Sequence, residues 1–365
     1  MFFRNTKPVC FKNINFAYMK VIIDDKIPYI RTAADRLFGQ VAYLPGHAIS
    51  RAHLADADAL IVRTRTRCDA QLLFGTSVKM VATATIGYDH LDTAFLDSHR
   101  IAWTNCPGCN ATSVAQYVRN AMLSMQQEGL LQLQGLRVGI VGAGHVGQAV
   151  AHVLRPWGAV CLLNDPPRAH TEGPQDFHSL DELAATCDVI TFHTPLTLSG
   201  PYATFHLAST AFFRRLRRRP VIINAARGGV VDEPALLAAM QQGLVSHCIV
   251  DTWEGEPHVS PALLQEAYLA TPHIAGYSAD GKANATRMAL QAVCAHFGIV
   301  ASFTIEPPAL DDSMRPDSDP VLRELQLYNP TFDSQALKAA PENFEQLRSH
   351  YPLRREVWNY VKPLF

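Results

Sequence analysis

Short apolar runs recur along the chain, and longer, more polar segments separate them. Such runs are typical of strands in a parallel sheet that helices cover on both faces. They form two successive series, so the pattern predicts an α/β protein with two doubly wound parallel sheets, Rossmann-like or flavodoxin-like. The first series comprises residues 20–24, 41–44, 59–62, 80–84 and 101–103, and the second comprises 137–141, 159–164, 188–193, 221–225, 246–251 and 269–273.

Two segments with apolar residues at helical spacing, 111–129 and 279–297, divide the chain into domains. The first lies between the two series, and the second is placed to return the chain to the first domain. A proline- and aspartate-rich stretch at 306–320 indicates a linker to a last module that is too short to bury much apolar surface alone. The expected domains are an N-terminal extension at 1–19, a substrate-binding domain at 20–112 plus 275–300, a nucleotide-binding domain at 113–274 and a small α+β module at 301–365.

Residues 1–18 precede the first predicted strand and contain basic and aromatic residues. They include no continuous apolar segment and no small-residue cleavage site. Because the periodic pattern begins at Met19, we expect the segment 1–19 to be an extension that is disordered or not native. A weak export signal is the alternative.

The composition is that of a globular protein, with 48% apolar and 18% charged residues among 365. The net charge of −1 gives no reason to expect nucleic acid or a membrane surface as a partner. No apolar stretch approaches the roughly 20 residues of a membrane-spanning helix.

Eight cysteines are scattered through the chain, which fits reduced thiols and a cytoplasmic location. Cys106 and Cys109 form a CxxC sequence without the context of a thioredoxin-like unit, so a loop is favoured over a redox site. No second cysteine pair and no histidine stand at ligand spacing, so no metal site is expected.

A glycine-rich sequence follows the predicted strand 137–141 and opens a helical segment. Its spacing is that of a dinucleotide-binding loop, in which amides at a helix N-terminus bind the pyrophosphate. Asp165 ends the next strand and is placed to accept hydrogen bonds from the adenosine ribose, which favours NAD over NADP, although Arg168 keeps NADP open. The cofactor contacts predicted here are Gly142, Gly144, His145, Val146, Gly147 and Asp165.

Three ionisable residues follow predicted strands downstream of this loop: Arg227, Glu256 and His273. The planar guanidinium of Arg227 can pair with a carboxylate through two hydrogen bonds and stays charged at any relevant pH. The imidazole of His273 suits proton transfer near neutrality, and Glu256 would orient it and stabilise its protonated form. The sequence therefore predicts NAD-dependent oxidation of a 2-hydroxy acid, with these three residues as the catalytic set.

The spacing of the three residues and several surrounding sequences resemble the D-specific 2-hydroxyacid dehydrogenase family. The resemblance covers residues 20–365, and within the family it is greatest for the members that oxidise 4-phospho-D-erythronate in pyridoxal 5′-phosphate (vitamin B6) synthesis. It is carried by residues 83–90, 107–111, 165–169, 192–196, 253–257, 273–277, 342–351 and 354–356.

The resemblance implies an oligomer and further contacts. By this likeness, the module at 301–365 is a dimerisation domain and the chain forms a homodimer. Thr64, Thr85 and Tyr277 match substrate-contacting positions. The further NAD contacts that the likeness implies are Thr194, Ala225, Ala226, Arg227, Asp251 and Gly276.

Two arginine clusters are interpreted separately. The loop at 63–67 departs from the family, which usually has Ser where this chain has Thr64, and it carries additional arginines. Cations after a strand of the first domain suit a phosphorylated substrate, so Arg63 is also predicted as a substrate contact, whereas Arg65 or Arg67 is expected to face solvent. The cluster at 214–219 has the composition of a nucleic-acid patch, but a solvated connection is favoured.

The resemblance, together with these features, implies oxidation of 4-phospho-D-erythronate to (R)-3-hydroxy-2-oxo-4-phosphooxybutanoate, with a proton relay through His273 and Glu256. Oxidation of 3-phosphoglycerate or of another D-2-hydroxy acid is the alternative within the class. The sequences at 254–257 and 274–277 and the terminal module argue against 3-phosphoglycerate. A non-catalytic NAD(H)-sensing binding protein is the alternative from another class. The intact set of Arg, Glu and His argues against that alternative.

Overall fold

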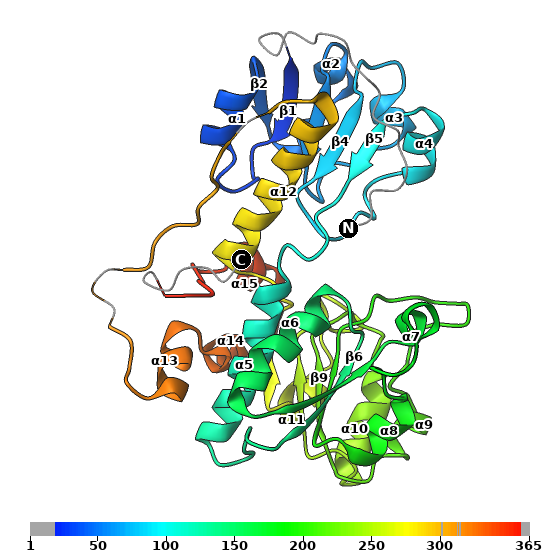
Figure 1. Cartoon of the computed structure of the whole chain (residues 1–365), viewed down its shortest axis with the longest axis vertical. Coiled ribbons are helices and arrows are strands. Elements are labelled where there is room, and N and C mark those ends of the chain that lie inside the picture. Colours follow the sequence, from blue (N-terminus) through cyan, green and yellow to red (C-terminus); the bar gives the residue numbers. More distant parts are fainter. Residues whose placement is uncertain (1–18, 301, 312, 314, 359–365) are drawn as a thin grey trace. The chain divides into compact units, whose positions relative to one another are not determined.

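The computed structural model describes residues 19–300, 302–311, 313 and 315–358, and these residues divide into two compact units (Figure 1). Unit 1 contains the described residues up to Cys109 together with those of Asp280–Pro308. Unit 2 contains Asn110–Ala279 and the described residues from Ala309 onward. The expected N-terminal extension covers residues 1–19. Residues 1–18 lie outside the described part of the chain, whereas Met19 is described and is buried in the core of unit 1, so the extension cannot include it.

Unit 1 is built on a five-stranded sheet in the order β2-β1-β3-β4-β5, and all of its strand pairs are parallel. The order reverses between β1 and β3, which is where ligands bind in sheets of this kind. The strands are β1 (Lys20–Asp24), β2 (Gln40–Leu44), β3 (Ala59–Val62), β4 (Met80–Thr83) and β5 (Ala102–Thr104).

Alternate residues of these strands enter two separate cores, so the sheet of unit 1 is covered on both faces. Val21 and Ile61 pack with helix α12 (Ala279–Phe297), whereas Ile22 and Leu60 pack with the short helices on the other face. These strands are apolar on both faces because both faces are buried. The other helices of unit 1 are α1 (Arg31–Leu37), α2 (Arg51–Leu54), α3 (Ala70–Leu73) and α4 (Thr93–Ser98), with the 3-10 turn η2 (Gly46–Ala48).

Unit 2 contains a six-stranded parallel sheet in the order β11-β10-β9-β8-β6-β7, with the reversal between β6 and β8. One face packs against α5 (Ala111–Gln127) and α6 (His145–Leu154). The strands are β6 (Arg137–Val141), β7 (Val160–Asn164), β8 (Val189–Phe192), β9 (Val221–Asn224), β10 (His247–Val250) and β11 (Leu269–Ala270).

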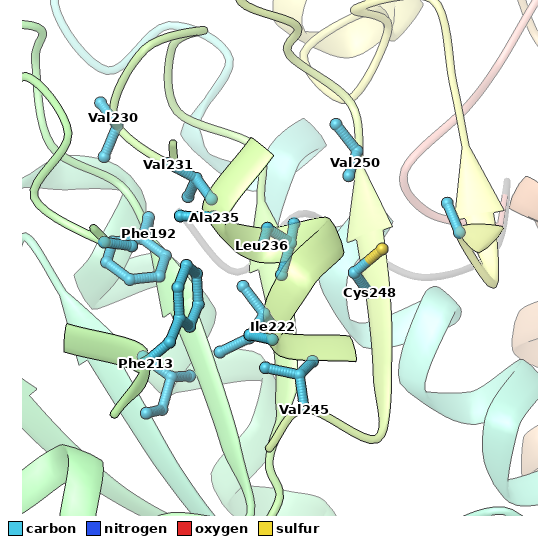
Figure 2. Packing of buried hydrophobic residues seen from close by; sticks show 14 of the residues in the cluster. Phe192, Phe213, Ile222, Val230, Val231, Ala235, Leu236, Val245, Cys248 and Val250 are labelled. Atoms are coloured by element: carbon cyan, nitrogen blue, oxygen red, sulfur yellow. The ribbon is translucent and has the colours of Figure 1, made fainter. Parts of the chain in front are cut away.

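The other face of this sheet packs against four further helices. Figure 2 shows Phe192 and Ile222 of the strands in one buried cluster with Phe213 and Leu236, which come from helices of this layer. The fold class predicted from the apolar runs is therefore confirmed for both units. The covering elements are α8 (Leu180–Thr186), α9 (Thr210–Phe213), α10 (Glu233–Gln241) and α11 (Pro261–Glu266); α7 (Pro166–Glu172) and η3 (Arg155–Trp157) flank β7.

The C-terminal segment folds onto unit 2. Its elements are α13 (Pro320–Leu327), α14 (Pro330–Ala339), η4 (Pro341–Asn343) and α15 (Phe344–Ser349). Leu337 and Phe344 join the core beneath the sheet, and the Ser334 hydroxyl accepts a hydrogen bond from the backbone N–H of Ala270 at 3.0 Å. The residues described here form helices and no strand, so the α+β character expected of this module is not confirmed.

The last strand is the clearest difference from the predicted boundaries. The apolar run predicted a strand over 269–273, but β11 ends at Ala270. Pro272 lacks a backbone N–H for the ladder, and His273 adopts a left-handed backbone with φ of 55°. The chain therefore leaves the sheet before His273 and turns this side chain into a loop.

Among the described helices, none combines the length and apolar character that a bilayer-spanning segment needs. The seven cysteines of the described residues form no disulfide with one another, and most are buried. Within the same residues, no three His, Cys, Asp or Glu side chains gather in a way that suits a metal ion.

Candidate active site

The glycine-rich loop connects β6 to α6 and is held by close backbone contacts. An ideal Cβ placed on Gly147 would lie 2.0 Å from the carbonyl oxygen of Gly142, so no larger residue fits there. A Cβ on Gly142, which has φ of 92°, would lie 2.8 Å from the backbone of His193. These glycines allow β6, its loop and the end of β8 to approach closely.

Gly144 differs from its neighbours, since a Cβ at this position would meet no protein atom within 4 Å. It is the N-cap of the ten-residue helix α6, and it is exposed, as is His145. Because no protein atom requires a glycine here, the open space suits the backbone approach of a dinucleotide pyrophosphate to the helix N-terminus.

The end of β8 lies beside this loop and is followed by buried polar atoms that have no hydrogen-bond partner in the described part of the chain. Nδ1 of His193 and the hydroxyl of Thr194 are both buried and unpaired in the described residues, whereas Nε2 of His193 lies 2.9 Å from the Thr191 hydroxyl. Burial lowers the pKa of His193 to about 3, so this imidazole is neutral. Unsatisfied buried polar atoms at the strand-order reversal fit the polar groups of a bound dinucleotide.

Asp165 follows β7 and joins the glycine-rich loop to the next helix. Its carboxylate accepts hydrogen bonds from the N–H of Ala143 at 2.9 Å and of Arg168 at 3.1 Å. Arg168 in turn pairs with Glu172, with Nη2 and Oε2 2.7 Å apart, and also donates to the carbonyl of Ala143. Each oxygen of the Asp165 carboxylate keeps a lone pair that can accept a hydrogen bond from a ribose hydroxyl. Because the Arg168 guanidinium is already bonded to Glu172 and to the carbonyl of Ala143, it is not placed to bind the 2′-phosphate of NADP.

The three predicted catalytic residues lie in loops at the carboxyl ends of adjacent strands of one sheet. Arg227 follows β9, Glu256 follows β10 and His273 follows β11. In open parallel sheets this edge is where ligands bind. The structure therefore places all three at one edge of unit 2.

His273 and Glu256 are directly paired. Nδ1 of His273 lies 2.8 Å from Oε2 and 3.0 Å from Oε1 of Glu256. Because an ionised carboxylate only accepts hydrogen bonds, Nδ1 must carry the proton, and Nε2 is left as the basic atom. The side chains are 28% and 22% exposed, so the basic atom can meet a substrate without being fully hydrated.

Glu256 is held in its ionised form. Burial alone would raise the pKa of this carboxyl, but the hydrogen bond and charge of His273 and the N–H of Trp253, 3.0 Å from Oε1, lower it overall. His273 itself has a left-handed backbone, and such strained conformations in non-glycine residues cluster at functional sites.

Asp251 organises the loop that carries His273. It is 1% exposed and accepts hydrogen bonds from the Thr271 hydroxyl at 2.7 Å and from the N–H groups of Ile274 at 2.8 Å and Ala275 at 3.0 Å. Burial raises the pKa of Asp251. These hydrogen bonds therefore hold the loop, and the contact of Asp251 with NAD remains a prediction.

Arg227 is exposed on a loop that is itself tightly fixed. A Cβ on Gly228 would lie 1.9 Å from the carbonyl oxygen of Trp253, so this loop touches the one that leads to Glu256. The Asn224 side-chain amide donates to the carbonyls of Arg227 at 3.2 Å and of Thr252 at 3.3 Å. Among the described residues the guanidinium forms no hydrogen bond or ion pair with His273 or Glu256, and it donates to the carbonyl of Ala226 at 2.7 Å.

The C-terminal segment supplies a residue to this loop that was not predicted. Arg354 is 3% exposed, and its Nη1 donates to the carbonyls of Ile274 and Ala275, both at 3.2 Å. Its Nε donates to Gln116 of α5 at 2.9 Å, and its guanidinium stacks on the ring of Tyr328 at 3.8 Å. The backbone just after His273 is therefore tied to the C-terminal segment.

The predicted substrate contacts of unit 1 stand at the carboxyl ends of β3 and β4. Nη1 of Arg63 donates to the carbonyl of Lys26 at 3.1 Å, and Thr64 is exposed. The Thr85 hydroxyl donates to the carbonyl of Gly87 at 2.8 Å. Arg67 pairs with Asp69 at 3.1 Å, as expected of an arginine outside the substrate set.

Residues 110–275 match the family model of the D-isomer specific 2-hydroxyacid dehydrogenase NAD binding domain. Over 342 residues the chain is 49% identical to an erythronate-4-phosphate dehydrogenase of Bacteroides thetaiotaomicron, and the match covers 94% of this chain and 98% of that protein. The chain belongs to the D-isomer specific 2-hydroxyacid dehydrogenase family. The erythronate-4-phosphate dehydrogenase of Proteus mirabilis is 40% identical, with 94% of each chain covered.

Solved structures of this dehydrogenase family share the fold. An NAD-bound 3-phosphoglycerate dehydrogenase of Entamoeba histolytica matches with a TM-score of 0.62 at 23% identity, over 77% of this chain and 95% of that one. A D-lactate dehydrogenase of Aquifex aeolicus, in complex with NAD and lactic acid, has a TM-score of 0.58 at 22% identity, over 77% and 96% of the two chains. The protein is an NAD-dependent dehydrogenase, and NAD is its cofactor.

Proposed function

We propose that this dehydrogenase oxidises 4-phospho-D-erythronate to (R)-3-hydroxy-2-oxo-4-phosphooxybutanoate with NAD, in the synthesis of pyridoxal 5′-phosphate. The observation that carries the reaction type is the His273–Glu256 pair, with Nδ1 and Oε2 2.8 Å apart at the edge of the nucleotide-binding sheet. The substrate rests on relatives named erythronate-4-phosphate dehydrogenase that match 94% of this chain.

The chemistry of the protein residues follows from their donors and acceptors. Arg227 holds the C1 carboxylate of the substrate through its planar guanidinium. Nε2 of His273 accepts the proton of the C2 hydroxyl, and Glu256 stabilises the imidazolium that forms. NAD, when bound, supplies the nicotinamide C4 that takes the hydride from C2, so the alcohol loses two electrons and the proton stays on His273.

The phosphate requires further cations and hydroxyls. Arg63 and Thr64 follow β3 at the strand-order reversal of unit 1, where a ligand of that sheet would bind, and we assign them to the phosphate. Thr85 and Tyr277 complete the proposed substrate contacts.

The proposal also covers the cellular location and the oligomeric state of the enzyme. We expect a cytoplasmic homodimer whose interface involves the C-terminal segment, with a small phosphorylated 2-hydroxy acid as the substrate. Sedimentation of the purified full-length chain tests the oligomeric state, since a monomer at micromolar concentration would contradict it.

The experiment that tests the substrate is NADH formation with 4-phospho-D-erythronate and 3-phosphoglycerate in parallel. An added 2-oxo acid accepts hydride from any cofactor that stays bound. A higher kcat/KM for the four-carbon acid supports the proposal, and a higher value for 3-phosphoglycerate replaces it with that reaction. NAD binding without turnover of either acid would favour an NAD(H)-sensing protein.

A further inference from the structure

Arg348, on α15 of the C-terminal segment, lies beside the catalytic loop. Its Nη2 atom is 3.5 Å from the hydroxyl of Tyr277, and its guanidinium carbon is 5.8 Å from the centre of that ring. Tyr277 closes a turn that starts after His273, because its N–H donates to the carbonyl of Ile274 at 2.8 Å. The C-terminal segment thus presents a cation to the loop that carries the proposed base.

The guanidinium is partly buried and incompletely bonded. The side chain is 22% exposed, and its Nε is buried without a hydrogen-bond partner among the described residues. Its ion pair is with Glu345 at 3.2 Å, three residues earlier on the same helix, and that carboxylate is 59% exposed. A buried guanidinium N–H without a partner among the described residues can donate a hydrogen bond to an oxygen of a bound ligand.

The electrostatic surroundings connect Arg348 with the catalytic pair. Burial alone would lower the pKa of Arg348, but the nearby Tyr277 and Glu256 raise it overall. Glu256 has its pKa lowered in part by Arg348, after the larger effects of burial and His273. The charge of Arg348 therefore acts within the neighbourhood of the proton-transfer site.

The proposed substrate has an anionic group at each end, and the doubly charged phosphate can take more than one cationic contact. Arg227 follows β9, whereas Arg348 comes from α15, so the two guanidiniums stand on separate segments. A 2-hydroxy acid with one anionic group needs one such contact, and a substrate with a carboxylate and a phosphate at opposite ends needs two. Resting on the proposed function, we propose that Arg348 is a specificity-determining residue that binds the substrate phosphate through its Nε and Nη2 donors, in addition to the contacts assigned above to Arg63 and Thr64.

The test compares two ligands that each keep one anionic group of the substrate. D-Erythronate lacks the phosphate, and D-erythritol 4-phosphate lacks the carboxylate; both are measured as competitive inhibitors of 4-phospho-D-erythronate oxidation. R348A should weaken inhibition by D-erythritol 4-phosphate about 10- to 100-fold and leave D-erythronate inhibition within about 2-fold. R348K should recover part of the loss, because it keeps a charge without the fork of donors.

Two controls make the result specific. R227A should give the opposite pattern, with D-erythronate weakened and D-erythritol 4-phosphate spared. R323A removes an arginine from α13 of the same segment and should change neither inhibitor. Equal losses of both inhibitors in R348A, or no loss of either, would overturn the proposal.

A failure of the Arg348 proposal can be distinguished from a failure of the proposed reaction. If the unmodified enzyme prefers another phosphorylated 2-hydroxy acid, the proposed function fails, and the same comparison is made with that acid and its dephosphorylated form. If R348A no longer binds NAD or melts at a much lower temperature, R348K provides the decisive measurement: selective recovery of the phosphorylated inhibitor supports the contact, and equal recovery of both contradicts it.

Discussion

Nδ1 of His273 donates to Glu256 at 2.8 Å, and the same carboxylate accepts the N–H of Trp253 at 3.0 Å. The imidazole is therefore oriented by a group that is itself fixed by the backbone. This relationship links the loop after β10 to the loop after β11, and it leaves Nε2 of His273 as the basic atom. Substitution of His273 should affect catalysis, and substitution of Glu256 should affect both catalysis and the pH dependence of stability.

His273→Ala should lower kcat by roughly 10²–10⁴, because general base catalysis contributes factors of this size. NAD binding should be unchanged, since the glycine-rich loop lies elsewhere in unit 2. Steady-state NADH formation together with calorimetric titration of NAD measures both quantities. An unchanged kcat would remove His273 from the proton transfer.

Glu256→Gln should lower kcat by roughly 10²–10⁴ through loss of the fixed tautomer. The substitution should also change how the free energy of unfolding depends on pH in the acid range. The pKa of Glu256 in the folded protein is below its ordinary value of 4.5, so its ionisation stabilises the fold above that pH. This contribution is lost as the pH falls through the lowered pKa.

The melting temperatures of the original protein and of E256Q should therefore differ most above pH 4.5 and converge at lower pH. Scanning calorimetry between neutral and acid pH measures this difference. A gap that stays constant down to the lowest pH would show that the ionised carboxylate does not stabilise the fold.

Arg227→Ala should reduce kcat/KM by at least about 10-fold, the effect of one charged hydrogen bond, because the carboxylate loses its bidentate partner. Arg227→Lys should recover only part of the loss. R215A is the matched control, since this exposed arginine pairs with Asp181 away from the strand ends. Equal rates for R227A and the unmodified enzyme would place the carboxylate contact elsewhere.

Gly147→Ala and Gly144→Ala form a pair with opposite expectations. A Cβ on Gly147 meets backbone oxygen at 2.0 Å, so the apo protein should lose about 1–3 kcal/mol of stability or more. A Cβ on Gly144 meets no protein atom within 4 Å, so G144A should fold normally and bind NAD more weakly. Denaturant unfolding and NAD titration measure the two effects, and equal behaviour of the variants would contradict this assignment.

Much of unit 2 was predictable because its signals are local. The glycine spacing, the buried strands and the positions of Arg227, Glu256 and His273 after strands are all visible within short windows of sequence. β11 was predicted too long, because its apolar run hides the effects of Pro272 and of the left-handed backbone at His273.

The contacts of the C-terminal segment were not predictable in the same way. Arg354 bonds to backbone 79 and 80 residues earlier, and nothing local to it indicates those partners. The sequence at 354–356 was noted for its family likeness, which was the one signal available. The hydrogen bonds of Asp251 to Ile274 and Ala275 were likewise not predictable, because they arise from tertiary structure; its contact with NAD, which the family likeness implies, stays a prediction.

The tie between Arg354 and the loop after His273 has a consequence for biosynthesis. A ribosome makes the glycine-rich loop and all three catalytic residues long before it reaches Arg354. A nascent or prematurely terminated chain that ends before this residue contains every group needed for chemistry, yet the carbonyls of Ile274 and Ala275 have lost their guanidinium donor. The catalytic loop therefore gains this donor only after the codon for Arg354 has been translated.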